Sequence, residues 1–170
     1  MLKFIKRLML FILALALILA VALFIYVNSE RFAPPIASLR CSLTAASDND
    51  YLRYKKSLGM IGYAQLRRDP FKDVIYLYWL AEAGKSENGL NQAKRLNESV
   101  SQYSGIDYID YETRVRRSFD RQTLEYRREV LNQNNQITSW MTRYCILISD
   151  DAFERLRLKS AEATKAKQKI

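Results

Sequence analysis

The sequence contains no histidine, only two cysteines, and five glycines scattered along its 170 residues. The lack of histidine excludes Ser-His-Asp and Cys-His catalytic arrangements, and also zinc sites that mix histidine with cysteine. Two cysteines are too few for a four-cysteine zinc site. The chain also has no S-x-x-K motif and no glycine-rich phosphate loop. We therefore expect no metal site, no cofactor and no enzymatic activity.

A pair of carboxylates is the remaining candidate for acid–base chemistry. Asp107 and Asp110 lie three positions apart, and two acids can act as proton donor and acceptor when a cleft holds them together. No pattern in the surrounding sequence indicates such a cleft. We interpret both as solvated loop acids, which is the usual role of such pairs.

The N-terminal region contains a long apolar run. Residues 8–27 are 20 residues without a charge, enough for a helix that crosses a hydrocarbon core of about 30 Å. A cleaved signal peptide is the alternative interpretation. The run is longer than a usual signal core, and the following NSERFAPP has no clean small-x-small cleavage site, so we favour an uncleaved anchor.

Charges at the two ends of this run predict its orientation. Lys3, Lys6 and Arg7 precede it, whereas Glu30 and Arg31 roughly cancel after it. Positive flanks stay in the cytoplasm, so residues 1–7 should form a cytoplasmic stub and the rest should be periplasmic. We expect a single-pass protein of the bacterial inner membrane. Residues 28–35, with Pro34 and Pro35, should form an extended spacer that lifts the following domain off the bilayer.

The two cysteines then lie in an oxidising compartment. Cys41 and Cys145 are the only possible pair, are too far apart for a C-x-x-C redox motif, and should form a disulfide. Two buried free thiols are the alternative. Residues on both sides of Cys41 alternate as in a half-buried strand with the cysteine inward, and the strand around Cys145 is apolar on both faces. We expect a sheet or barrel that closes on its first strand.

Residues 36–150 read as one β-rich domain of about six to eight antiparallel strands. Residues 57–68 and 73–84 should form a hairpin around Asp69-Pro70, and 111–119 and 124–130 should form two further strands. Residues 85–104 fit a short helix or an exposed strand, and we favour the strand. Residues 151–170 should form a basic helical tail, with Asp150 and Asp151 as N-cap residues and an end that frays.

Basic residues outnumber acidic ones, and the net charge is +9. Such a balance could favour anionic partners or lipid head groups, but we interpret it as a solvated surface that leans positive. The run RVRR at 114–117, with Arg127 and Arg128, could suggest nucleic acid. Alternation places these arginines opposite Glu112, Glu125 and Glu129 on a strand pair, so we expect cross-strand ion pairs and no nucleic acid partner.

Aromatic residues are the main positive signal for function. Ten tyrosines and both tryptophans follow residue 30, and many of them lie in the expected strands. These side chains combine an apolar body with a polar tip, which suits either a core or a ligand pocket. We predict that Tyr76, Trp79 and Trp140 line a pocket.

The order of these features resembles the FidL/ToxS-type small membrane proteins. It comprises the anchor at 8–27, Cys41 in the first strand, the strand-rich middle, and Cys145 in a late strand. The resemblance implies a lipocalin-like periplasmic barrel that stabilises or co-senses with a ToxR-type regulator and binds a small amphipathic molecule. The basic tail after Asp151 departs from that plan.

Two other classes of function fit the same features. A periplasmic immunity or inhibitor protein would use an exposed patch to block a toxin or hydrolase. A structural subunit of an envelope or secretion assembly would use the anchor as an interface. The anchor has small residues for helix packing but no G-x-x-x-G motif: Ala14, Ala16, Ala20 and Ala22.

Overall fold

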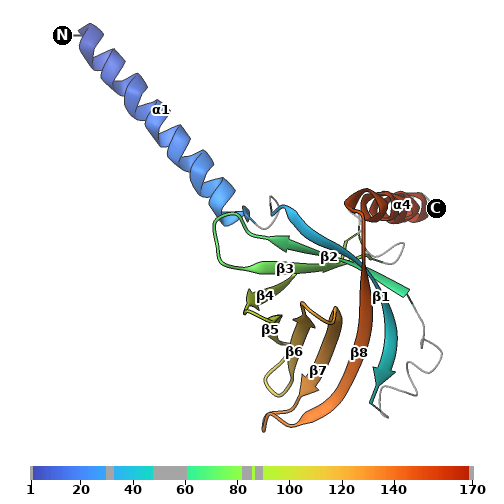
Figure 1. Ribbon diagram of the computed structural model, residues 1–170. Coiled ribbons are helices and arrows are strands. Elements are labelled where there is room, and N and C mark those ends of the chain that lie inside the picture. The colour runs from blue at the N-terminus through green and yellow to red at the C-terminus, as the bar shows by residue number, and fades with distance from the viewer. Residues whose placement is uncertain (1, 30–32, 48–60, 82–85, 87–89, 169–170) are drawn as a thin grey trace.

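The protein consists of an apolar helix, an eight-stranded closed barrel and a C-terminal helix (Figure 1). The computed structural model describes residues 2–29, 33–47, 61–81, 86 and 90–168. This architecture confirms the predicted fold class.

The first helix, α1 (Leu2–Val27), projects away from the barrel (Figure 1). Its segment Met9–Val27 has a mean hydropathy of 3.1, and none of it is buried within the protein. A row of large apolar side chains in water would be unfavourable. Length and composition therefore suit a membrane anchor or a signal sequence.

The barrel is an up-and-down arrangement in which each strand pairs antiparallel with the next. Strong alternation and β-branched or aromatic residues favour extended backbone in most of these segments. The strands are β1 (Pro35–Ala46), β2 (Ile61–Arg68), β3 (Ile75–Trp79), β4 (Lys94–Glu98), β5 (Gln102–Tyr108), β6 (Arg114–Asp120), β7 (Glu125–Leu131) and β8 (Ile137–Ile148).

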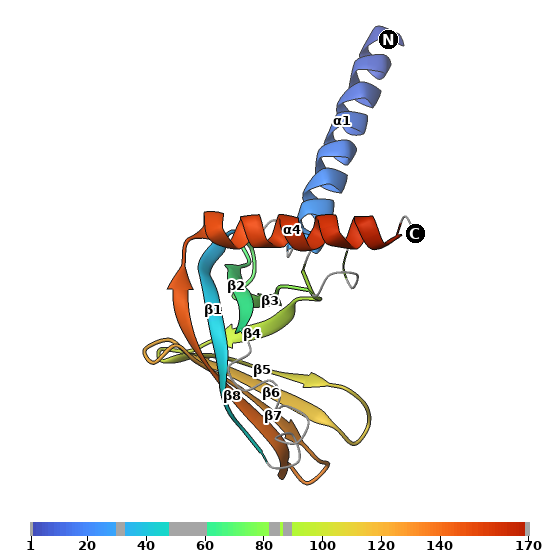
Figure 2. The same ribbon diagram turned by 90° about the vertical axis from the view of Figure 1, so that its right-hand side faces the viewer.

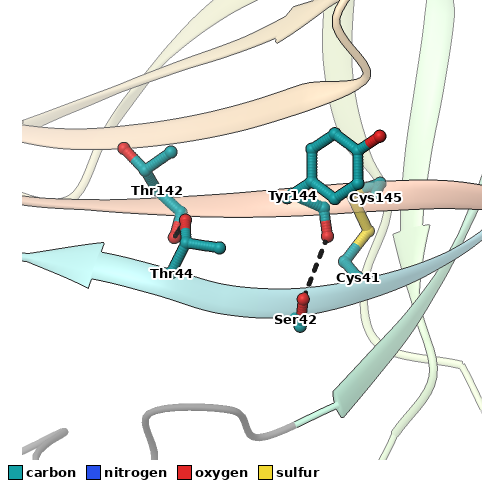
Figure 3. Close-up of a disulfide and its surroundings, with 6 residues drawn as sticks. All are labelled: Cys41, Ser42, Thr44, Thr142, Tyr144 and Cys145. Atoms are coloured by element: carbon teal, nitrogen blue, oxygen red, sulfur yellow. Dashed lines mark hydrogen bonds between the residues drawn. A yellow bond between two sulfur atoms is a disulfide. The ribbon is translucent and has the colours of Figure 1, made fainter.

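The barrel closes where the first strand meets the last. β1 and β8 pair from Ser38 with Ile148 to Ala46 with Met141, and Cys41 lies directly opposite Cys145. The two sulfurs form a disulfide between Cα atoms 3.9 Å apart (Figure 3). The predicted disulfide and the closure on the first strand are both confirmed.

Side-chain hydroxyls reinforce this seam on the outer face of the barrel. Ser42 Oγ donates to the carbonyl oxygen of Tyr144 at 3.5 Å (Figure 3), and Thr44 Oγ1 donates to that of Thr142 at 3.2 Å. Because these bonds run from β1 to β8, they add local support to the ladder that the disulfide crosses.

The predicted strands agree with the structure in most places. The hairpin around Asp69-Pro70 is confirmed by the pairing of β2 with β3, although residues 57–60 lie outside the described residues. The strand interpretation of 85–104 is confirmed for β4, and no helix forms there in the described part. The fifth strand was not predicted, because Ser104, Gly105 and Asp107 have low strand propensity.

The hydrophobic core fills the barrel interior. Inward positions of β1, β2, β3 and β4 supply Leu39, Leu66, Leu77 and Leu96, each almost fully buried. Tyr103 and Phe119 stack at 6.4 Å between ring centroids on β5 and β6. Alternate residues of each strand therefore bury their apolar side chains as the period of two predicts.

The C-terminal helix, α4 (Asp150–Gln168), packs on the outer face of β1 and β2. Phe153, Ala161 and Thr164 are buried, and Ser160 Oγ donates to the carbonyl oxygen of Ala81 at 2.7 Å. The tail is thus a docked helix through Gln168, and the expected fraying is not seen in its described part. Small side chains allow the close approach, although they give a weak apolar pattern in the sequence.

The predicted N-cap residues of α4 were wrong. Ser149 caps the helix, because its Oγ accepts the backbone N–H of Ala152 at 3.3 Å. Asp150 instead accepts the hydroxyl of Ser38 at 2.6 Å, and Ser38 accepts the side-chain amide of Gln65 at 2.9 Å. Asp150 therefore ties the start of α4 to β1 and β2.

The C-terminal end of α1 contacts the barrel at the turn between β2 and β3. Ser29 is fully buried and donates to Asp69 Oδ2 at 2.6 Å, on the turn between β2 and β3. Tyr26 packs against Phe71 of the same turn, with 6.4 Å between ring centroids. The end of α1 therefore rests directly on the barrel.

Asp69 organises this junction. It accepts the backbone N–H of Phe71 and Lys72 at 2.8 and 3.0 Å, and the hydroxyl of Tyr76 at 3.2 Å. Burial raises the pKa of Asp69, but the hydrogen bonds from Ser29, the turn and Tyr76 together hold it below its ordinary value.

We predict that Cys41→Ser or Cys145→Ser lowers the free energy of unfolding by about 2–5 kcal/mol, because the disulfide closes a loop of nearly the whole domain. Urea unfolding of the full chain, followed by fluorescence, measures this. Reductant should destabilise the wild type to the same extent and leave the variants unchanged. Equal stability of the oxidised and reduced chains would contradict the prediction.

We also predict that Asp69 contributes to acid sensitivity. Because its folded pKa is depressed, its stabilisation is present above its unfolded pKa of about 3.9 and is lost as the pH falls through the folded value. The free energy of unfolding should therefore fall with pH below about 4. Asp69→Asn should reduce stability at neutral pH and flatten this dependence, with Asp73→Asn as the control on the same turn. An unchanged acid slope in Asp69→Asn would refute the assignment.

Candidate functional site

A cavity of about 760 Å³ lies inside the barrel. Its lining includes Ile61 and Gly62 at the start of β2, and Trp79 at the end of β3. The turn that contacts α1 joins the opposite ends of these two strands. The cavity therefore lies toward the barrel end remote from α1. Its volume is in the range of pockets that hold drug-sized ligands.

The cavity lining is basic. Among the described lining residues, four from four strands are cationic and none is acidic: Lys94, Arg117, Arg128 and Arg143. Asp107 on β5 forms ion pairs with Arg117 and, at 3.9 Å, with Lys94. The side chain of Arg128 forms no hydrogen bond or salt bridge with any described residue. One acid thus offsets part of the charge, and the described lining residues together retain a net positive charge.

Apolar and aromatic side chains complete the lining. Trp79 and Tyr126 meet edge to face with 5.2 Å between ring centroids, and Met141 lies nearby on β8. The guanidinium carbon of Arg143 lies 5.2 Å from the centroid of the Trp79 ring. The cavity therefore combines a flat apolar surface with cationic groups, a pairing that suits an aromatic or amphipathic anion.

Tyr126 remains a neutral hydroxyl in this environment. Burial raises its pKa, and the positive charges of Arg117, Arg128 and Arg143 oppose that shift without reversing it. A protonated phenol among cations can donate a hydrogen bond to an anionic group.

Gly62 allows the side chains of Arg143 and Trp79 to lie close to the backbone of β2. A Cβ atom at this position would lie 3.0 Å from both the Arg143 guanidinium and the Trp79 ring. A larger residue would therefore push into the cavity at the point where its cationic and aromatic walls meet.

The three predicted pocket residues do not share one site. Trp79 lines the cavity. Tyr76 is buried on the outer side of β3, in a small cluster with Ala33, Val74 and Tyr78. Trp140 also faces outward, beneath the guanidinium of Arg127 at 5.5 Å. Aromatic content alone could not separate these three, because both faces of β3 and β8 carry large apolar residues.

Sequence reasoning missed the basic lining, although a signal was present. Arg143 alternates with Met141 and Cys145, and Arg117 alternates with Val115 and Phe119. An inward cysteine or phenylalanine in such a pattern implies that the arginines between them also point inward. On the sequence alone, Arg117 and Arg128 are instead expected to form cross-strand ion pairs, and Arg143 has no assigned role.

The acidic pair does not form an acid–base site. Asp107 is engaged by Arg117 and Lys94. Asp110 accepts the backbone N–H of Glu112 and Thr113, each at 2.8 Å, and these bonds hold the pKa of Asp110 below its ordinary value. Each carboxylate has its own structural partners, and the two belong to different contacts.

The expected ion pairs on β6 and β7 form in part. Glu129 bonds Arg116 at 2.5 Å and Arg127 at 2.9 Å, on the outer face of the barrel. Glu112 and Glu125 form no salt bridge with a described residue. Arg117 and Arg128 point inward instead, so the run RVRR does not make a continuous basic surface.

The pairing between neighbouring strands is shortest between β4 and β5. These strands pair only at Asn97 with Ser104 and Glu98 with Tyr103, whereas β5 pairs with β6 at seven positions. A Cβ atom on Gly105 would lie 2.3 Å from the carbonyl oxygen of Arg95, so only glycine permits this close approach. Beyond Gly105, β5 has no second partner strand among the described residues.

Apolar side chains are exposed along and beyond this part of β5. The set is Ile106, Tyr108, Ile109 and Tyr111, each more than half exposed. Exposed apolar groups beside an unpaired strand edge are typical of interaction sites. The β5–β6 hairpin thus forms a second candidate surface.

Comparison with known proteins gives no relative. The chain matches no protein-family model, no curated protein and no solved structure.

Proposed function

We propose that this protein is a non-enzymatic, single-pass protein of the bacterial inner membrane whose barrel binds a small amphipathic anion and stabilises, or senses together with, a partner membrane protein. The partner that fits the sequence resemblance is a ToxR-type transcriptional regulator. The cytoplasmic end would be the N-terminus, given Lys3, Lys6 and Arg7, and the barrel would be periplasmic.

The basic and aromatic cavity is the observation that carries this proposal. Guanidinium groups bind carboxylate or sulfate-type anions through two parallel hydrogen bonds, and Arg128 and Arg143 both line the cavity. The rings of Trp79 and Tyr126 would cover the apolar body of the same ligand. No residue set in the described lining offers a nucleophile with an adjacent base, so binding is better supported than turnover.

The exposed edge of β5 supports the part of the proposal that concerns a partner protein. A strand from the partner's periplasmic domain can pair with the open side of β5 beyond Gly105, and its side chains can contact Ile106 and Tyr108. Tethering both proteins to one membrane raises their effective concentration, so even a small added strand would suffice.

We predict that the cavity binds aromatic anions. Trp140→Phe leaves Trp79 as the sole tryptophan, so its fluorescence reports the cavity directly. In full-length protein in neutral nanodiscs, 1-naphthalenesulfonate should quench Trp79, whereas the cation 1-naphthylmethylammonium should not. Arg128→Gln with Arg143→Gln should weaken sulfonate binding by about tenfold or more, since charge-assisted hydrogen bonds contribute about 1.5–3 kcal/mol each.

Arg121→Gln is the control for this measurement, because Arg121 lies at the β6–β7 turn outside the cavity lining. It should leave the affinity unchanged. Equal quenching by the anion and the cation, or unaltered affinity in the double arginine variant, would show that the cavity does not select anions.

We predict that the β5–β6 hairpin contacts the partner. A photo-crosslinking amino acid at Ile106 or Tyr111 should capture a winged-helix membrane regulator in intact cells, identified by mass spectrometry. The same group at Val100, which is fully exposed on the preceding turn, should not. Ile106→Asp should also lower the regulator's steady-state level, since a bound partner stabilises the folded state. Capture of a toxin or a secretion subunit alone would refute this assignment.

A further inference from the structure

The outward side of α4 is a second basic surface, separate from the cavity. After the first turn, the exposed residues of α4 include four cations and one acid: Arg155, Leu158, Lys159, Glu162, Lys165, Ala166 and Lys167. Within the described part of the chain, Arg155, Lys159 and Lys165 form no salt bridge. Packing on the barrel uses the opposite side of the helix and does not account for these charges.

This basic surface lies at the barrel end from which α1 emerges. Arg67 contacts Glu154 of α4 at 3.8 Å, and Asp69, two residues later, holds Ser29 at the end of α1. Figure 2 shows α4 crossing this end of the barrel, level with the last turns of α1, and Figure 1 agrees. In both views the barrel lies on one side of α4 and α1 extends to the other.

Two aromatic residues lie at the same end of the barrel, where α1 joins it. Tyr26 in the last turn of α1 and Phe71 on the β2–β3 turn are both more than half exposed and contact each other. Lys72 lies over the Tyr26 ring at 5.1 Å. Aromatic and basic side chains of this kind concentrate where a transmembrane helix meets the lipid head groups.

We propose that the outward side of α4 lies on the surface of the bilayer that α1 enters, with Arg155, Lys159 and Lys165 bound to anionic phospholipid head groups. The inference rests on the proposed role of α1 as a membrane anchor. Among the described residues of α4, Leu158 is the one large apolar residue on this side, so attraction of charges, not insertion, supplies the binding.

Contact at both α1 and α4 would fix how the barrel sits on the membrane. A single helix leaves the barrel free to rotate about the junction at Ser29, whereas a second contact removes that freedom.

The test uses the full-length chain in nanodiscs. Leu158→Cys, labelled with an environment-sensitive fluorophore, reports the outward side of α4, because Cys41 and Cys145 are joined and do not react. Lipids with a nitroxide on the head group should quench the label strongly in discs of phosphatidylglycerol and phosphatidylcholine. Quenching should be weak in phosphatidylcholine alone and should fall at high salt.

Charge reversal supplies the matched variants. Arg155→Glu with Lys159→Glu should lower the ratio of docked to undocked barrel by about 30-fold or more, since each basic side chain near an anionic surface changes it roughly fivefold. Arg40→Glu with Arg95→Glu, exposed on β1 and β4, makes the same change in net charge and should have little effect. Arg155→Gln with Lys159→Gln should act in the same direction to a smaller extent.

Three outcomes would overturn the inference. One is equal quenching with and without the anionic lipid, and another is the same loss in both charge-reversed pairs. The third is quenching that occurs only in native membranes and depends on an acidic protein. A chain that does not incorporate into discs would instead contradict the anchor, so the two failures are distinguishable.

Discussion

The pairing of β1 with β8 is the constraint on which the rest of the structure depends. These strands lie at opposite ends of the domain, and the disulfide joins residues 104 positions apart. Without this pairing, eight strands in sequence order would form an open sheet with two free edges. With it they enclose an interior, and α4, which follows β8 directly, is brought onto β1 and β2.

The interior of the closed barrel has two parts, a packed apolar end and an end that contains the basic cavity. Leucines of the first four strands fill the end that rests on α1, with Leu66 and Ile75 flanking the β2–β3 turn. Toward the other end, the inward positions change to Gly62, Trp79, Arg117, Arg128 and Arg143, and space remains among them. The leucine core contributes hydrophobic stabilisation. The end that contains the cavity can therefore hold charged side chains, which a fully packed core would exclude. The same strands therefore supply both the packed core and the basic cavity.

Much of this plan could be predicted from the sequence because it depends on local patterns. Alternation around Cys41 identified its inward side, and the strand composition of 73–84 identified β3. The partners in the disulfide could be assigned without structural information, because a chain with two cysteines has only one possible pairing. The helical C-terminus was also identified from its composition, although its docking was not.

The parts that escaped prediction depend on residues distant in the chain. Glycine is required at position 105 because the Arg95 carbonyl, ten residues earlier in the chain, approaches β5 closely. Ala161 and Thr164 are buried because the barrel surface lies beneath them, and nothing in their local sequence indicates this. Likewise, the charge of the cavity depends on which face of each strand points inward. Where both faces of a strand are apolar, the local sequence does not determine this, and the register within the closed barrel does.

The central claim is that the barrel holds a small amphipathic anion. Native mass spectrometry of the full-length protein, released gently from its own membranes, tests this most directly. The account predicts a species that carries a single small anionic molecule and that disappears when Arg128 and Arg143 are both changed to glutamine. Only the mass of the bare chain, in wild type and variant alike, would contradict it.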